Sequence, residues 1–103
     1  MEGRRSTRVL AKLNLLLAMG GVSHNALTAV VNRDGALILS PVSYPVDTEL
    51  EVRNMNTGES AAARVVWYGG PDQGGLFKLG IELTDNLPGF WKVEYPEAPA
   101  PKA

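Results

Sequence analysis

Hydrophobic and polar residues alternate along most of this chain, with the period of two that is typical of β-strands with one buried face. The clearest example is segment 48–53, in which Leu50 and Val52 alternate with charged residues. Segment 76–83 repeats the pattern, with its larger apolar residues at every second position. No segment shows a sustained helical period of 3.6 residues, so the pattern predicts an all-β protein.

Turn signals between the apolar segments divide the chain into short strands. The predicted strands cover residues 9–17, 26–31, 36–39, 48–53, 60–68 and 76–83. Between them, segments 20–25 and 69–75 have the composition of loops. The Asp34-Gly35 pair predicts a tight hairpin, because glycine adopts a positive φ without steric cost. Six short strands joined by frequent turns favour a barrel or a sandwich.

A length of 103 residues fits one domain. We expect residues 1–8 to form a flexible arginine arm, residues 9–95 the β-domain and residues 96–103 a disordered tail rich in proline and alanine. After the last strand, a set of apolar residues is expected to pack across the domain as a short cap. These residues are Leu87, Phe90, Trp91, Val93 and Tyr95.

Composition excludes several kinds of chemistry. The chain has no cysteine, which rules out disulfides and thiolate metal sites. Its one histidine, His24, lies in a predicted loop and is expected to be solvated, so we predict neither a metal site nor an enzyme. No apolar segment is long enough for a transmembrane helix, and we expect a cytoplasmic protein without a cofactor or membrane contact.

The net charge is −1, from 10 basic and 11 acidic residues, but the basic residues are unevenly placed. Arg4, Arg5 and Arg8 follow one another closely near the amino end. Guanidinium groups bind phosphate bidentately and stack on flat bases, so such an arm suits a nucleotide ligand. Taken alone, these arginines are more typical of a basic tail that is merely solvated.

The order of the sequence motifs along the chain carries more information than the arginine arm alone. The arginine arm leads directly into a strand, and an Asn-Arg-Asp-Gly turn (32–35) precedes an apolar strand. A long hairpin that contains Val-Val-Trp (65–67) follows, and then Leu-Gly-Ile-Glu-Leu (79–83) and Phe-Trp (90–91). From residue 4 to about residue 95 the chain resembles the PilZ domain family, bacterial receptors for cyclic di-GMP. The resemblance implies a six-stranded antiparallel β-barrel.

The resemblance also implies a binding site. Arg4 and Arg8 match the family's Arg-x-x-x-Arg arm, with Arg5 as an auxiliary contact. Gly35 matches the glycine of the family's second motif, Asp/Asn-x-Ser-x-x-Gly. In that motif Asn32 stands in the place of serine and Val30 in the place of Asp or Asn. The implied cyclic di-GMP site therefore consists of residues Arg4, Arg5, Arg8, Asn32, Arg33 and Gly35.

The implied function is that of a signalling module whose arm folds over the nucleotide and changes the surface offered to a protein partner. Because Val30 forms no hydrogen bonds with its side chain and Asn32 replaces the motif's serine, an alternative is a PilZ-like domain that has lost the nucleotide and acts through protein contacts. A third alternative, a single-strand nucleic-acid binder on an OB-like barrel, requires a basic groove that the net charge argues against. Trp67 and Trp91 are expected in the core and the cap rather than as surfaces for base stacking.

Overall fold

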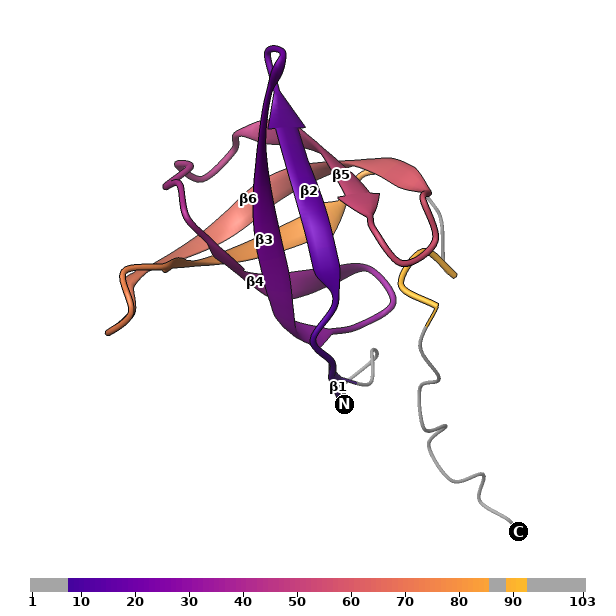
Figure 1. Cartoon of the computed structure of the whole chain (residues 1–103), viewed down its shortest axis with the longest axis horizontal. Helices are drawn as coiled ribbons and strands as arrows, with labels where there is room; N and C mark the ends of the chain where they lie inside the picture. The colour runs from indigo at the N-terminus through magenta and orange to yellow at the C-terminus, as the bar shows by residue number, and fades with distance from the viewer. Residues whose placement is uncertain (1–7, 86–88, 93–103) are drawn as a thin grey trace, which may run out of the picture.

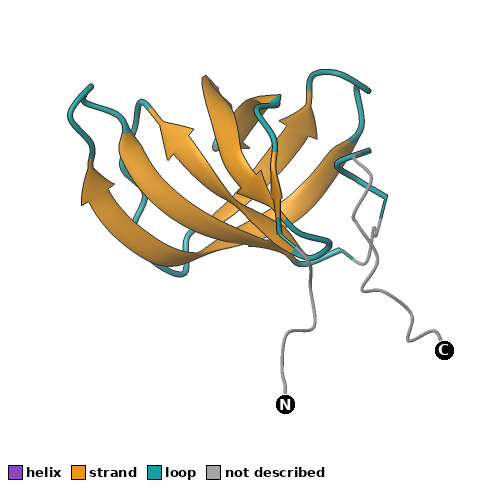
Figure 2. Ribbon diagram, turned by 90° about the horizontal axis from the view of Figure 1, so that it is seen from below, coloured by secondary structure: helices purple, strands orange, loops and turns teal. Residues whose placement is uncertain are grey.

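A computed structural model describes residues 8–85 and 89–92. These residues form strands and turns without a helix (Figure 2). The strands are β1 (Val9–Leu10), β2 (Asn14–Met19), β3 (Val22–Val31), β4 (Gly35–Ser40), β5 (Glu49–Asn54), β6 (Ser60–Pro71) and β7 (Phe77–Leu83). Within these ranges there is accordingly no helix of the length and hydrophobicity needed to cross a membrane.

Six of the strands close into an antiparallel barrel (Figure 1). The hydrogen-bonded order is β3-β2-β5-β6-β7-β4, and β4 returns to pair with β3, so the barrel has no free edge. The short strand β1 is additional and pairs with the end of β3. The predicted six-stranded antiparallel barrel is confirmed, and β1 is the one strand beyond it.

The core is formed by the inward-facing residues of every barrel strand. Strand β5 shows the predicted alternation in full, because Leu50 and Val52 are buried while the charged residues between them are exposed. The side chains that are completely enclosed include Leu15, Leu17, Val31, Ile38, Val52, Val65 and Leu79. Burial of such side chains contributes about 1.5–3 kcal/mol each, which makes this core the main source of stability.

The predicted strand 9–17 is divided into β1 and β2, and Thr28 explains the division. The Thr28 hydroxyl accepts a hydrogen bond from the backbone N–H of Leu13 at 2.8 Å and donates one to the carbonyl of Ala11. This side chain, 1% exposed, therefore binds the backbone of the segment that separates β1 from β2 and interrupts the regular pairing with β3. Prediction of one continuous strand was wrong because the pattern of apolar residues does not reveal where a hydroxyl from another strand is inserted.

Two predicted loops are shorter than expected. Gly20 and Gly21, with φ of 61° and 83°, complete the turn from β2 to β3 by themselves, since two-residue hairpins need positive φ at both positions. His24 is consequently in β3, paired with Leu17, and is not a loop residue. On the other side of the barrel β6 continues to Pro71, and the turn that follows is built on Asp72, whose carboxylate accepts backbone hydrogen bonds from Gly74 and Leu76.

Of the predicted cap, the structure describes residues 89–92. Phe90 and Trp91 are each 1% exposed and pack edge to face with ring centroids 4.9 Å apart. Asn54, at the end of β5 and itself fully buried, donates a hydrogen bond from Nδ2 to the carbonyl of Phe90 at 2.9 Å. The other predicted cap residues, Leu87, Val93 and Tyr95, lie outside the described residues, as do Arg4, Arg5 and the tail 96–103.

Candidate functional site

The turn between β3 and β4 is organised by Asn32. Its side-chain oxygen accepts hydrogen bonds from the backbone N–H groups of Asp34 and Gly35, each at 2.8 Å. Its own N–H donates to the carbonyl of Gly35 at 2.9 Å. An asparagine oxygen that closes a turn in this way fixes the backbone between two strands. Asn32 therefore shapes the turn, and its side-chain oxygen already has two donors.

Gly35 is required by close packing and not by a positive φ. Among the described residues, the glycines with a positive φ do not include Gly35. The expectation that this glycine serves the hairpin through a positive φ was therefore wrong. A Cβ atom added to Gly35 would lie 2.1 Å from the carbonyl oxygen of Ile81 and 3.1 Å from the Cα of Glu82. Gly35 is paired with Glu82 across β4 and β7, so the glycine lets these two backbones come close together.

Arg8 lies beside this turn because β1 pairs with β3. The pairs Val9–Val31 and Leu10–Val30 bring the start of β1 to the end of β3, immediately before Asn32. Arg8 is exposed and shares the lining of one hollow with Val30 and Asn32. The structure thus brings together one arm residue and one turn residue that the sequence assigned to the same site. Arg33 is exposed at the middle of the turn and does not line this hollow.

The hollow lies on the outer wall of the barrel and has a volume of about 450 Å³. A row of paired residues runs beneath it across four strands: Val30 of β3 faces Leu37 of β4, Leu37 faces Gly80 of β7, and Gly80 faces Trp67 of β6. Paired residues of antiparallel strands point to the same side of the sheet, so this row is a continuous surface. Gly80, which has no side chain, leaves space between Leu37 and Trp67. The full lining comprises Arg8, Val30, Asn32, Ala36, Leu37, Val66, Trp67, Gly80 and Ile81.

Trp67 is not a core residue, contrary to the prediction. The register of β6 against β7 shifts between Val65 and Trp67, so Val66 is an extra residue in β6. Such a bulge reverses the alternation of inward and outward side chains. Val65 remains buried, whereas Val66 and Trp67 are 43% and 49% exposed. Trp91, in contrast, is buried as expected.

A second hollow, of about 330 Å³, adjoins the first and shares Asn32, Val66 and Ile81 with it. Its remaining lining includes the carboxylates Asp34 and Glu82. Glu82 forms an ion pair with Arg64 at 3.5 Å, in which both side chains are about half exposed. These acidic residues therefore line the second hollow, which Arg8 does not line.

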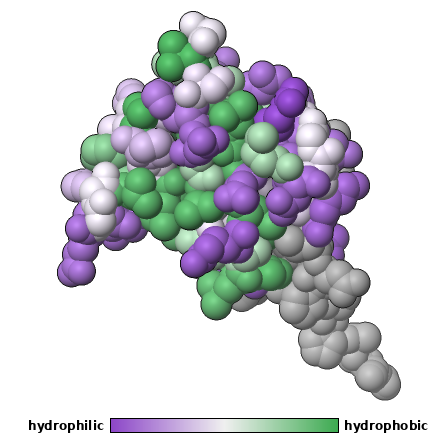
Figure 3. Space-filling model, in the orientation of Figure 1, coloured by the Kyte–Doolittle hydropathy of each residue, from purple (hydrophilic) through white to green (hydrophobic). Residues whose placement is uncertain are grey.

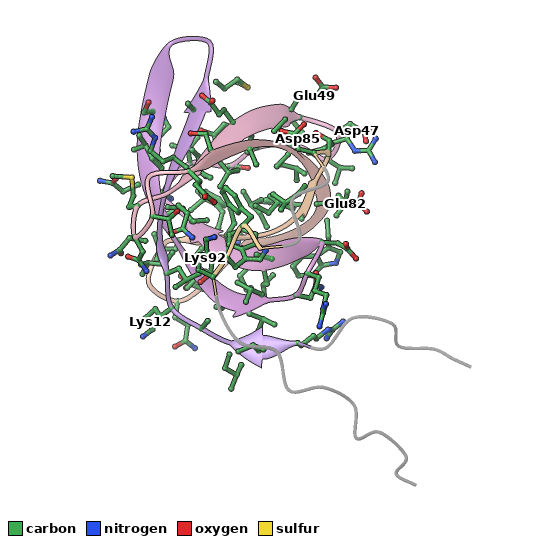
Figure 4. The ribbon with its side chains drawn as sticks, turned by 90° about the vertical axis from the view of Figure 1, so that its right-hand side faces the viewer. Lys12, Asp47, Glu49, Glu82, Asp85 and Lys92 are labelled. Atoms are coloured by element: carbon green, nitrogen blue, oxygen red, sulfur yellow. The ribbon has the colours of Figure 1, made fainter. Side chains whose placement is uncertain are left out.

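The charged residues are unevenly arranged around the barrel. In Figure 4, Asp47, Glu49 and Asp85 lie together at one side of the molecule with Glu82 next along the rim, and Lys12 lies across from them. An anionic ligand is favoured where Arg8 is nearest and the carboxylates are farthest. Elsewhere, burial raises the pKa of Tyr44 above its usual value of 10.0, but Tyr44 does not line either hollow.

Sequence reasoning missed the wall of the hollow formed by Leu37, Val66, Trp67 and Gly80. The signal that could have indicated it is the glycine in the middle of the strand 79–83, since an interior glycine often marks a close approach or a bulge. The outward face of the barrel also carries apolar surface beyond the hollow. Figure 3 shows such an area in the middle of the face that β2 and β3 cross, surrounded by hydrophilic residues.

The closed barrel, with β1 laid on the end of β3, is a PilZ-like fold. The structure is similar to that of the Bacillus subtilis inhibitor of motility (MotI/DgrA), with a TM-score of 0.71. The match covers 89% of this chain and 47% of the other chain at 14% sequence identity, so this chain spans about half the length of that protein. At this identity the likeness shows the fold alone. No family model and no curated protein matches the chain.

Proposed function

We propose that this chain is a PilZ-like signalling domain that binds cyclic di-GMP in the hollow between Arg8 and Trp67. The observation that carries the proposal is the pairing of Val9 with Val31, which holds Arg8 at the hollow that Val30 and Asn32 also line. An arginine beside an apolar surface suits a ligand that has both phosphates and flat bases.

Each part of the hollow has a chemical counterpart in the ligand. The Arg8 guanidinium can donate hydrogen bonds to a phosphate, and Leu37, Val30 and Trp67 can offer apolar contact to a base. We propose that Arg4 and Arg5, which lie outside the described residues, close over the ligand from the arm. The signal is then a change in the surface offered to a protein partner when the arm becomes ordered.

A second candidate function is a PilZ-like domain that does not bind nucleotide and acts through protein contacts. Val30 favours it, because its half-buried side chain offers no hydrogen bond to a ligand group in the hollow. A ligand group desolvated there without a partner costs about 1–3 kcal/mol, which weakens binding roughly ten- to hundredfold. The side-chain oxygen of Asn32 is engaged within the turn and adds little compensation.

Calorimetric titration with cyclic di-GMP separates the two candidates. The wild-type chain is expected to saturate, and Arg8→Ala to bind about ten- to hundredfold more weakly, because a hydrogen bond to a charged group contributes about 1.5–3 kcal/mol. Lys12→Ala is the matched control, since Lys12 is an exposed cation that follows β1 and does not line the hollow. Absence of heat at high micromolar ligand would reject nucleotide binding and favour the second candidate.

A further inference from the structure

Three leucines form an apolar stripe on the outside of the barrel. Leu16, Leu27 and Leu39 each lie between two buried residues of β2, β3 and β4, so their side chains point outward, where they are partly exposed. Leu27 faces Leu39 across β3 and β4. Leu16 faces Asn25, two residues before Leu27, so Leu16 and Leu27 are diagonal neighbours. This leucine stripe belongs to the face on which Figure 3 shows apolar surface surrounded by hydrophilic residues.

The barrel does not need these leucines for its own core. The same strands already supply enclosed core residues, among them Leu15, Leu17 and Ile38. In β5, by comparison, every outward position carries a charged residue, as expected for a wall that faces only water. An apolar patch with a polar rim typically marks an interaction site. The leucine stripe is therefore expected to have an occupant.

A basic residue lies at each end of the leucine stripe. Arg53 of β5 faces Leu16, and Lys78 of β7 faces Leu39 at the opposite end. Neither cation forms an ion pair with any residue that the structure describes. The two charges are thus available to an anionic group at either end of the stripe, and such a group would be attracted by both.

We propose that the leucine stripe is the docking site of an amphipathic helix of a protein partner, with apolar residues toward the barrel and acidic residues near both ends of the helix. The stripe crosses from β5 through β2, β3 and β4 to β7. Neighbouring strands are about 4.8 Å apart, so it extends about 19 Å along the wall. An α-helix of about 13 residues has this length. Such helices dock through apolar side chains at positions i, i+3 or i+4, and i+7.

A protein helix suits this face better than an anionic membrane does. Asn14 and Asn25 are exposed beside the stripe, paired with Leu27 and Leu16 respectively. Pressing these amides into lipid would cost free energy, because they would lose their hydrogen bonds with water. A helix can place its own polar side chains over them. The proposal goes beyond the proposed function, because it names a second surface and the chemistry of the partner and does not require nucleotide.

The test is fluorescence anisotropy with a labelled helical peptide of about 14 residues that has leucines along one side and glutamates near both ends. The full chain is expected to bind this acidic peptide saturably. Leu27→Ser and Leu39→Ser, each checked for folding by circular dichroism, are expected to bind it about tenfold more weakly. Val46→Ser is the matched control, because Val46 is 47% exposed in the connection between β4 and β5 and lies off the stripe.

Charge variants test the two ends of the stripe. Arg53→Glu and Lys78→Glu are each expected to bind the acidic peptide severalfold more weakly, with a larger difference at low salt. Glu51→Gln is expected to bind it more tightly, because Glu51 is exposed two residues before Arg53 on the same side of β5. Lys92→Glu removes an exposed cation outside the stripe and should bind like the wild-type chain. A peptide with lysines in place of the glutamates should bind far more weakly.

Four results would overturn the proposal. These are no saturation by the acidic peptide at high micromolar concentration, equal binding of the acidic and basic peptides, equal binding by Leu27→Ser and the wild-type chain, and preference for vesicles containing phosphatidylglycerol over the peptide. Self-association of the chain in sedimentation equilibrium, lost in Leu27→Ser, would assign the stripe to a second copy instead. Calorimetry with cyclic di-GMP tests the proposed function separately, so either proposal can fail while the other stands.

Discussion

Two turns at the same end of the barrel are each built on an asparagine, and the two asparagines differ in what surrounds them. Asn32 lies between β3 and β4, half-buried at the edge of the hollow. Asn54 ends β5 and is fully buried beneath the cap. Each accepts backbone hydrogen bonds with its side-chain oxygen, but Asn54 also donates to the cap at Phe90. The same type of side chain thus holds the fold together in one place and shapes the edge of the proposed binding surface in the other.

If the proposed site is correct, the two turns separate stability from ligand binding. The side-chain amide of Asn54 is hydrogen-bonded within the protein through both its oxygen and its nitrogen, and the neighbouring aromatic rings are enclosed. Around Asn32 the neighbouring arginine and tryptophan are exposed and border empty space. Substitutions near Asn54 should accordingly lower stability, and substitutions near Asn32 should mainly lower ligand affinity.

The largest expected effect on stability is that of Asn54→Ala. It leaves the carbonyl of Phe90 and the N–H of Asn56 without their partners and opens a cavity, at a cost of about 3 kcal/mol in the free energy of unfolding. Urea denaturation measures this loss. The control is Asn56→Ala, an exposed position expected to stay within about 0.5 kcal/mol of the wild-type value. Equal stability of the two variants would remove the contrast between the turns.

Gly35→Ala should have the next largest effect. Its methyl group would overlap the carbonyl oxygen of Ile81, so the strands β4 and β7 must move apart at a cost of about 1–3 kcal/mol. Thermal unfolding would report a lower melting temperature. Gly74→Ala is the control, because the nearest atom to its added Cβ is the Asp72 carboxylate at 3.5 Å, an ordinary contact. A stable Gly35→Ala protein that fails to bind ligand would instead assign this glycine to the ligand.

Asn32→Ala should lower stability by about 1 kcal/mol, because the N–H groups of Asp34 and Gly35 lose their acceptor at a partly exposed site where water replaces it. Asn32→Asp keeps an oxygen in the same place and should retain most of the stability. Chemical denaturation of both variants measures the difference. If Asn32→Asp is as unstable as Asn32→Ala, the turn does not depend on this acceptor.

The smallest effect on stability is expected for Arg8→Ala. Arg8 is exposed at the start of β1, and surface substitutions of this kind usually change the free energy of unfolding by less than about 0.5 kcal/mol. The same variant should lose most of its affinity for the ligand. Substantial destabilisation by Arg8→Ala, measured by urea denaturation, would mean that the arginine belongs to the fold rather than to the site.

Alternation along the chain was sufficient to predict the strands of an all-β domain, because each strand has one face toward the core, whereas the choice of a barrel came from the family resemblance. It did not predict the details that build the hollow. The bulge at Val66 depends on how β6 pairs with β7, and the break between β1 and β2 depends on a hydroxyl from β3. Both are consequences of pairing between distant segments, which local patterns do not encode.

The candidate site was predicted only in part, because it too depends on pairing between distant segments. The motif resemblance pointed to Arg8 and Asn32, and the structure places them at one hollow. Trp67 was assigned to the core because its neighbours are apolar, and the bulge moved it to the outer wall. The burial of Asn54 is not predicted by the sequence, because asparagine is common before a turn and only the folded chain shows the hydrogen bond from Asn54 to the cap.

The central claim is that nucleotide binds at the Arg8–Trp67 hollow and leaves the Asn54 turn untouched. The most direct measurement is amide and indole NMR of the wild-type chain during titration with cyclic di-GMP. We predict saturable shifts for residues 8–10, 30–35 and 66–67, including the Trp67 indole, while residues 54–58 and the Trp91 indole stay in place. Shifts centred on residues 54–58, or none at saturating ligand, would contradict the account.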